Sequence, residues 1–213
     1  MERLICVLVG YIFGLFQTSY LYGRIKKIDI RQEGSGNAGT TNALRTLGWK
    51  AGVITLVGDC MKCVLAVVVV KLIFADQKEV LNVYGIYAGL GAILGHNFPF
   101  YLGFKGGKGI AATGGLILAT ANPYITLILA IIFVITVAVS KYVSLGSIVL
   151  VVSYTVAMVI SGQLGFYEMT QGRLVEMYMV AVALMLLAIY KHKENIKRLL
   201  NGTENKFGSK KEK

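Results

Sequence analysis

The sequence predicts an all-α integral membrane protein with seven transmembrane helical segments, the fourth of them short. We expect its N-terminus outside the cell and its C-terminus in the cytoplasm. Hydrophobic residues make up 55% of the 213 residues and charged residues only 15%, and the mean hydropathy is +0.65; a soluble globular domain is far more polar. The net charge of +11 comes from clustered lysines and arginines, which favours a membrane surface over nucleic acid as the partner.

A transmembrane helix needs about 20 apolar residues, or about 17 at the short end. The first apolar segment could imitate a signal peptide, but no small-x-small cleavage pattern follows it and its apolar character continues to Leu21. We therefore expect an uncleaved first span. The seven segments lie at about residues 4–22, 51–74, 83–102, 110–121, 124–140, 142–161 and 174–190.

The fourth segment is short for a span, and it could be fused with the fifth across Asn122-Pro123 because membrane helices tolerate proline. The distribution of charge decides between the two arrangements. If the two segments form a helical hairpin, the basic residues of 24–50, 105–108, 141 and 191–213 all emerge on one side of the membrane. This is the positive-inside pattern, and fusion would break it. We therefore predict a hairpin, with the fourth segment crossing all or half of the bilayer.

Three polar clusters then lie on the cytoplasmic face, at residues 34–45, 96–109 and 192–204. Polar, glycine-rich sequence is ordinary in any single loop. Here, however, each of three loops on one side combines glycine with asparagine and a cation. Glycines let backbone N–H groups approach an oxyanion, and Lys105 and Lys108 add positive charge beside them. The clusters therefore predict a phosphate-binding site at the membrane border.

Two stretches match nucleotide-binding motifs only in part, so neither predicts a nucleotide site. Residues 34–39 fit G-x-G-x-x-G, but neither a buried strand nor a βαβ unit surrounds them. Residues 106–108 resemble the end of a Walker A loop, but Leu102 replaces its first glycine and Gly109 replaces the magnesium-binding Ser or Thr.

We expect neither a metal nor a cofactor. The chain has only two histidines, and Cys60-Met-Lys-Cys63 has no second ligand pair to complete a zinc site. Asp59 and Lys62 are one helical turn apart in an apolar segment, so they can neutralise each other. Support of the loop at residues 24–45 is a better interpretation of this pair than direct catalysis.

Three stretches of the sequence resemble the motifs of the bacterial PlsY family. The resemblance covers essentially the whole chain in order and spacing. Two positions depart from the family pattern: Thr40 stands where alanine is usual, and Lys191 stands where arginine commonly precedes the histidine. The matching residues are Ser35-Gly36-Asn37, Gly39, Thr41-Asn42 and Arg45; then Gly95-His96, Phe98-Pro99 and Phe104 to Gly109; then His192, Asn195-Ile196, Arg198-Leu199, Gly202-Thr203-Glu204 and Lys206.

The resemblance implies a seven-helix acyltransferase of the bacterial cytoplasmic membrane, with its active site on the cytoplasmic side. Such an enzyme moves a fatty acyl group from acyl phosphate to the 1-hydroxyl of glycerol 3-phosphate. The products are lysophosphatidic acid and inorganic phosphate, and the reaction is the first step of phospholipid synthesis. The expected partners are these two substrates and the lipid bilayer, without nucleic acid.

We expect Ser35, Asn37, Arg45 and Lys105 to hold the phosphate of glycerol 3-phosphate, joined by His192 and Asn195. Residues 106–109 are expected to hold the acyl phosphate, with backbone N–H groups facing the developing oxyanion. The catalytic candidates are His192, Asn195, Lys105, Ser35 and Arg45. The substrate-binding candidates are Asn37, Gly39, Thr41, Asn42, His96, Asn97, Gly106, Gly107, Lys108, Gly109, Arg198 and Glu204.

A covalent acyl-enzyme is not expected. No Ser-His-Asp arrangement is visible. The His-x4-Asp signature of another acyltransferase class is also missing, because after four intervening residues the two histidines are followed by Tyr101 and Lys197. The base is either His192 or a phosphate oxygen of the donor, and the resemblance favours the phosphate.

A transporter for a phosphorylated molecule is the alternative from another class, and a membrane scaffold is a third. The centres of most segments are almost wholly apolar, and no inverted repeat is evident, so the sequence favours the enzyme. We expect one transmembrane domain over residues 1–213, a mobile basic tail at 207–213, and a monomer.

Overall fold

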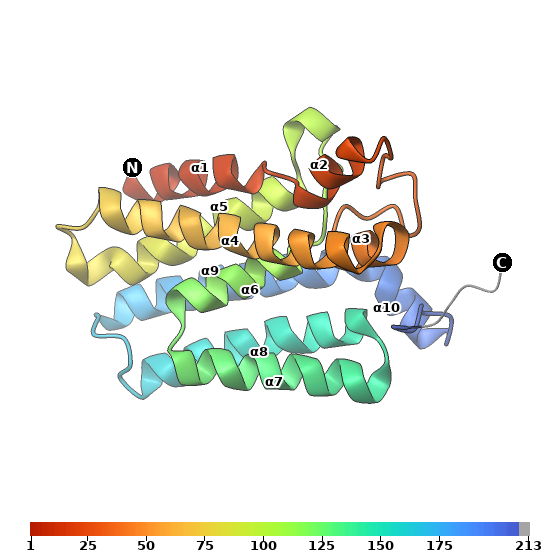
Figure 1. The fold of residues 1–213 in the computed structure, drawn as a ribbon. Helices are drawn as coiled ribbons and strands as arrows, with labels where there is room; N and C mark the ends of the chain where they lie inside the picture. Colours follow the sequence, from red (N-terminus) through yellow and green to blue (C-terminus); the bar gives the residue numbers. More distant parts are fainter. Residues whose placement is uncertain (209–213) are drawn as a thin grey trace.

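The computed structural model describes residues 1–208, and these residues form an all-helical bundle (Figure 1). This confirms the predicted class. Residues 209–213 of the predicted tail lie outside the described part. The elements are α1 (Glu2–Gly14), α2 (Thr18–Ile25), α3 (Thr40–Leu47), α4 (Trp49–Ile73), η1 (Lys78–Val80), α5 (Leu81–Asn97), η2 (Phe100–Leu102), α6 (Ile110–Thr120), α7 (Pro123–Ser140), α8 (Val143–Gln163), α9 (Gln171–Lys191) and α10 (Lys193–Leu200).

Five helical stretches of the described chain are long and apolar enough to cross a membrane. They are Glu2–Ile25, which combines α1 and α2, and the helices α4, α7, α8 and α9. Two further apolar helices are shorter: α5 has 17 residues and α6 has 11. The bundle is therefore that of a multi-pass membrane protein, and each of the seven predicted segments contains one of these helices.

The hairpin prediction for the fourth and fifth segments is confirmed. Helix α6 ends at Thr120 and α7 begins at Pro123, and the two helices run in opposite directions (Figure 1). The side chain of Asn122 caps α7 by accepting a hydrogen bond from the Tyr124 amide at 2.9 Å. Proline is favoured at the first helical position because its missing N–H would have no helical partner there. The Asn122-Pro123 pair thus begins a new helix instead of kinking one.

The three polar clusters lie at one end of the bundle, which we call the polar end. It carries α2, α3, the segment between α5 and α6, and α10 (Figure 1). The N-terminus and the connections α4 to α5, α6 to α7 and α8 to α9 lie at the other end. Clustering of the basic loops at one end agrees with the predicted distribution of charge.

Helices α1 and α5 pack through four glycines, two on each helix at a spacing of four residues: Gly10 and Gly14, and Gly91 and Gly95. A Cβ atom added at any of them would collide with a backbone carbonyl oxygen of the other helix. Small residues at this spacing let membrane helices approach closely. The contact fixes the position of the end of α5, from which the second polar cluster begins.

Two predicted segments are shorter as helices than their apolar sequence. The first breaks after Gly14, because the buried side chain of Gln17 donates to the carbonyl oxygens of Gly14, Gly95 and His96 at 3.1, 3.3 and 3.2 Å. The third ends at Asn97 instead of residue 102. Pro99 disfavours helical backbone at the residue before it, and Phe98 accordingly has a non-helical backbone, with φ −135° and ψ 58°.

Candidate active site

Each polar cluster leads into the N-terminus of a helix, and these helices are α3, α6 and α10. Their first backbone hydrogen bonds are donated by Ala43, Thr113 and Ile196. In the described chain, the amides of residues 40–42, 110–112 and 193–195 therefore have no partner, and none of the three helices has a side-chain cap. Free N–H groups at a helix N-terminus form a ready anion site.

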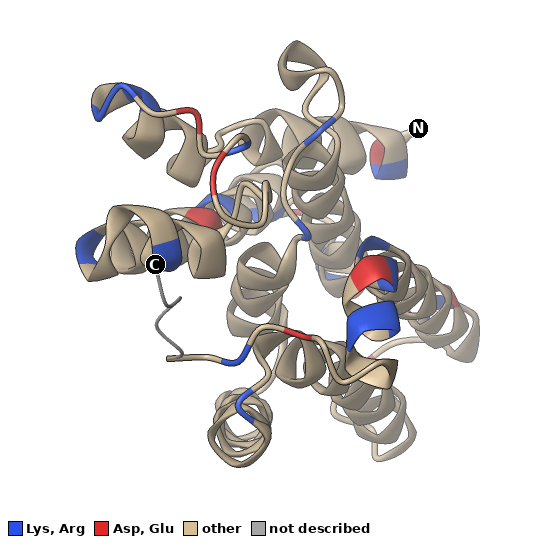
Figure 2. Ribbon diagram, turned by 90° about the vertical axis from the view of Figure 1, so that its right-hand side faces the viewer, with Lys and Arg blue, Asp and Glu red and all other residues tan. Residues whose placement is uncertain are grey.

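Direct contacts join the three clusters. Gly107 packs against the His96 ring, and a Cβ atom there would also lie 2.8 Å from the Ala38 carbonyl oxygen of the first cluster. The Lys108 ammonium donates to the Asn195 side-chain oxygen in the third cluster. The predicted convergence of the clusters is therefore present in the fold, and Figure 2 views this end of the molecule directly.

Positive charge gathers around Lys108. Burial and the nearby charges of Arg198, Lys191 and Arg45 together lower its pKa to about 8, with Glu204 acting in the opposite direction. These cations come from all three clusters. A bound anion would offset their mutual repulsion, so the site favours negatively charged ligands.

Glu204 organises the third cluster. One carboxylate oxygen accepts hydrogen bonds from Asn195 at 2.7 Å and Ser144 at 3.0 Å, and the other accepts from Arg198 at 2.7 Å. Burial raises the pKa of Glu204, but these hydrogen bonds outweigh burial and hold the pKa below its usual value. Glu204 is therefore an ionised anchor for Asn195 and Arg198, and a poor ligand for a phosphate.

His192 is buried at the N-cap of α10, and burial lowers its pKa to about 4. The ring is consequently neutral near pH 7. Its Nδ1 lies 2.8 Å from the Ala188 carbonyl oxygen, and a carbonyl can only accept, so Nδ1 carries the hydrogen. The lone pair of Nε2 is left to accept a hydrogen bond from a ligand hydroxyl.

The first cluster is shaped by Asn42, which is 1% exposed. Its side-chain oxygen accepts from the Ser35 amide at 2.9 Å, and its side-chain nitrogen donates to the carbonyl oxygens of Ile30 and Glu33 at 3.1 and 2.9 Å. This predicted substrate-binding residue thus holds the loop. Ser35 and Arg45 are exposed beside it. Among residues 1–208, the Arg45 side chain has no hydrogen bond or ion pair.

The second cluster differs from expectation at two glycines. The amides of Gly106 and Gly107 donate to the Asn97 and His96 carbonyl oxygens at 3.2 and 3.1 Å, so they are not free to bind an oxyanion. Free amides begin at Lys108 in the described chain. Gly109 caps α6 with a left-handed φ of 81°, a conformation that glycine adopts without steric cost.

The remaining predicted residues are placed as follows. Lys105 is exposed, and its side chain makes no hydrogen bond or ion pair with the rest of residues 1–208. Asn97 is fully buried, and both polar atoms of its side chain lack a partner in that same part of the chain. Thr41 lies in the first turn of α3, Gly39 is its N-cap, and Asn37 lies against Gly39.

Two residues near the site were not among its predicted members. Ser144, in the first turn of α8, bonds Glu204, but a serine in an apolar segment gives no sequence signal. Lys191 donates to the Asn97 carbonyl oxygen at 3.2 Å; its position before His192 was the available signal. Within the described residues, no three His, Cys, Asp or Glu side chains are placed to hold a metal.

Known proteins resemble this chain in sequence and in fold. The family model for glycerol-3-phosphate acyltransferase matches residues 4–202. The glycerol-3-phosphate acyltransferase of Clostridioides difficile (strain 630) is 43% identical over 212 residues, covering 98% of this chain and 97% of the relative. That of Alkaliphilus metalliredigens (strain QYMF) is 41% identical over 211 residues, covering 99% and 98%.

Two crystal structures of PlsY, an integral membrane glycerol 3-phosphate acyltransferase, also match. The glycerol 3-phosphate form has a TM-score of 0.81 at 33% identity, and the lysophosphatidic acid form has 0.79 at 32%. Each comparison covers 98% of this chain and 96% of the other. The chain therefore belongs to the PlsY family and is an integral membrane glycerol-3-phosphate acyltransferase that produces lysophosphatidic acid.

Proposed function

We propose that this enzyme takes the acyl group from acyl phosphate and transfers it directly to the 1-hydroxyl of glycerol 3-phosphate, releasing inorganic phosphate. The observation that carries the proposal is the convergence of three helix N-termini and several cations around Lys108. Both substrates carry a phosphate, and the site offers positive charge and free amides from three separate loops. One of the matching PlsY structures is the glycerol 3-phosphate form of that protein.

Glycerol 3-phosphate is held at the exposed side of the site. Arg45 supports this assignment because its side chain is exposed and lies close enough to Lys108 to lower its pKa. Lys105, Ser35 and Asn37 complete the proposed phosphate site, with Asn195 reaching it from α10. Each charge-assisted hydrogen bond to the phosphate would contribute about 1.5–3 kcal/mol.

Acyl phosphate is held at the N-terminus of α6. The free amides from Lys108 to Ala112 and the Lys108 ammonium support this assignment. Gly107 has no room for a side chain, because the His96 ring and the Ala38 carbonyl oxygen lie against it. Amide and ammonium donors stabilise the carbonyl oxygen as it becomes negative and the phosphate as it departs. The acyl chain extends from there into the bilayer.

The proton of the attacking hydroxyl passes to a phosphate oxygen of the donor. His192 supports this assignment because its pKa of about 4 makes it a weak base at neutral pH, while the phosphate gains negative charge as the acyl bond breaks. The free Nε2 of His192 accepts a hydrogen bond from the other free hydroxyl of glycerol 3-phosphate and so orients the substrate. The carbonyl carbon forms its bond to the glycerol oxygen as its bond to the phosphate oxygen breaks.

The seven helical segments cross the cytoplasmic membrane with the N-terminus outside and the polar end in the cytoplasm. The clustering of Lys and Arg at that end supports this orientation (Figure 2), because positively charged loops stay in the cytoplasm. A water-soluble glycerol 3-phosphate would then reach the site from the cytoplasm, and the acyl donor from the membrane. We propose that the monomer is the working unit.

Purified wild-type protein in lipid nanodiscs tests the reaction. With acyl phosphate and glycerol 3-phosphate, we expect equal amounts of inorganic phosphate and lysophosphatidic acid, and no product with acyl-CoA as donor. Radiolabelled acyl phosphate should leave no label on the protein, because direct transfer needs no acylated residue. A labelled acyl-protein that is chased into product by glycerol 3-phosphate would contradict direct transfer, and activity with acyl-CoA alone would contradict the donor.

A further inference from the structure

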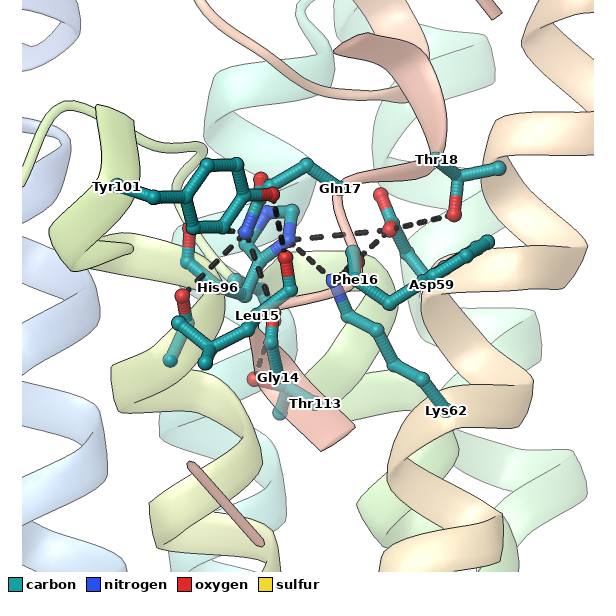
Figure 3. Close-up of polar contacts among 12 residues, drawn as sticks. Gly14, Leu15, Phe16, Gln17, Thr18, Asp59, Lys62, His96, Tyr101 and Thr113 are labelled. Carbon is teal, nitrogen blue, oxygen red and sulfur yellow. Dashed lines mark hydrogen bonds and ion pairs between the residues drawn. The ribbon is translucent and has the colours of Figure 1, made fainter. Parts of the chain in front are cut away.

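A buried ion pair lies beneath the second polar cluster, away from the proposed substrates (Figure 3). Asp59 and Lys62 of α4 are 1% and 4% exposed, and His96 at the end of α5 is 3% exposed. Lys62 lies 3.0 Å from Asp59, which also accepts a hydrogen bond from Thr18 at 3.0 Å. The pair thus meets residues 16–18 and His96, not the loop at residues 24–45 that the sequence predicted it to support.

The Lys62 ammonium has three hydrogen-bond acceptors around it: Asp59 at 3.0 Å, the Phe16 carbonyl oxygen at 2.7 Å and Nδ1 of His96 at 2.8 Å. An ammonium has three N–H donors and no acceptor. Each donor therefore has one partner, and Nδ1 of His96 must accept. A neutral imidazole that accepts at Nδ1 carries its hydrogen on Nε2.

Nε2 of His96 is aimed at the second polar cluster. It lies against Gly107, where a Cβ atom would collide with it, and near the Ala38 carbonyl oxygen of the first cluster. No hydrogen bond from Nε2 exists within residues 1–208. The backbone of His96 is fixed as well, because its carbonyl oxygen accepts from the Gly107 amide at 3.1 Å and from Gln17 at 3.2 Å.

We propose that Lys62, held by Asp59, is a positioning residue that fixes His96 as its Nε2–H tautomer, and that this N–H group donates a hydrogen bond to the acyl donor's phosphate beside Gly107. The identity of the ligand rests on the proposed function. The tautomer of His96 does not. A purely structural ion pair would stabilise the helices without determining which ring nitrogen of His96 carries the hydrogen.

The tautomer can be measured directly, because the chain has only two histidines. In wild-type protein labelled with ¹⁵N-histidine, NMR should show an unprotonated Nδ1 and a protonated Nε2 for His96, and the reverse for His192, whose Nδ1 donates to Ala188. The His192→Gln variant assigns the signals. A wild-type His96 with an unprotonated Nε2, or with both nitrogens protonated, overturns the proposal before any positioning variant is made.

The Lys62→Met variant tests the consequence for catalysis. We expect His96 to lose its single tautomer and the KM for acyl phosphate to rise roughly tenfold or more, with the KM for glycerol 3-phosphate changed less than about twofold. Lys71→Met is the matched control: Lys71 is also on α4 but bonds the Ala119 carbonyl oxygen instead, so both constants should stay at their wild-type values.

Removal of Lys62 alone leaves the Asp59 carboxylate buried without its partner, which can prevent folding. The double variant Asp59→Asn/Lys62→Met avoids this and should show the same selective rise in KM. An unchanged KM for acyl phosphate in a folded variant, or an equal rise for both substrates, overturns the proposal. Failure of the wild-type enzyme to use acyl phosphate contradicts the proposed function instead, and leaves the NMR result intact.

Discussion

Lys108 is a buried lysine among other cations, and this determines the pH range in which it can bind phosphate. Its ordinary pKa falls to about 8 through burial and through Arg198, Lys191 and Arg45, with Glu204 opposing them. A lysine is charged below its pKa and neutral above it. In the free enzyme, Lys108 is therefore an effective phosphate ligand only up to about pH 8.

We expect kcat/KM for acyl phosphate to fall as the pH rises through about 8, because this ratio reports the ionisation of the free enzyme. Lys108→Arg is the informative variant, since arginine stays charged throughout this range. Whatever its activity at neutral pH, its profile should be flat up to at least pH 9. If kcat/KM falls identically with pH in the wild type and in Lys108→Arg, the titrating group is not Lys108.

The chemistry of the site could be predicted from the sequence, but the direction of individual side chains could not. Clustering of glycine, asparagine and lysine in loops on the same side of the membrane was sufficient to predict that these loops meet. That they bind phosphate stays a prediction. Asn42 and Glu204 have side chains that could bind a ligand, yet both bond to other parts of the protein. Asn42 bonds Ser35, Ile30 and Glu33, and Glu204 bonds Asn195, Arg198 and Ser144. Those partners depend on the path of the backbone, which no local pattern specifies.

At the scale of elements, the bilayer makes helices predictable from hydropathy and leaves their interruptions unpredictable. A span must be apolar over about 20 residues, so the five long spans of the described chain could be located. The shorter helices α5 and α6 also lie where apolar segments were predicted. The break near Gln17 depends on the carbonyl oxygens of Gly95 and His96, which come from a helix far away in the sequence. The end of α5 at Asn97 had a local signal in Pro99, but the apolar residues after it obscured that signal.

The α1–α5 contact should be the interface most sensitive to added volume. Gly91→Ala would place a methyl group against the Val7 carbonyl oxygen, and separation of the helices would shift the segment that carries His96. Overpacking typically costs about 1–3 kcal/mol. We therefore expect a lower thermal midpoint in detergent and reduced activity.

Gly114→Ala provides the matched control for this interface. Gly114 is also helical, but a Cβ atom there meets nothing within 4 Å, so its thermal midpoint should equal or exceed that of the wild type because alanine is the better helix former. If Gly91→Ala is as stable as Gly114→Ala, the close approach of α1 and α5 is not important for stability.

At the scale of the whole molecule, the two ends of the bundle have different charge. The polar end carries the basic loops and the proposed site. Within the described residues, the opposite end has three ion pairs: Arg3 with Glu176, Arg173 with Glu79, and the N-terminal ammonium with Glu2. Opposite charges that pair within the protein leave little net charge to hold that end in the cytoplasm. We therefore expect the polar end, where Lys and Arg gather, to face the cytoplasm.

Single cysteines at the two ends test this orientation. In intact cells, a membrane-impermeant maleimide should label Lys78→Cys, which is exposed at the end that carries the N-terminus, and should not label Lys50→Cys, which is exposed at the polar end. Both should be labelled after the membrane is permeabilised. Wild-type protein is the background control, because Cys6 and Cys63 are buried and Cys60 is partly buried. Labelling of Lys50→Cys and not of Lys78→Cys in intact cells would reverse the topology, and it would put the site on the side without access to cytoplasmic glycerol 3-phosphate.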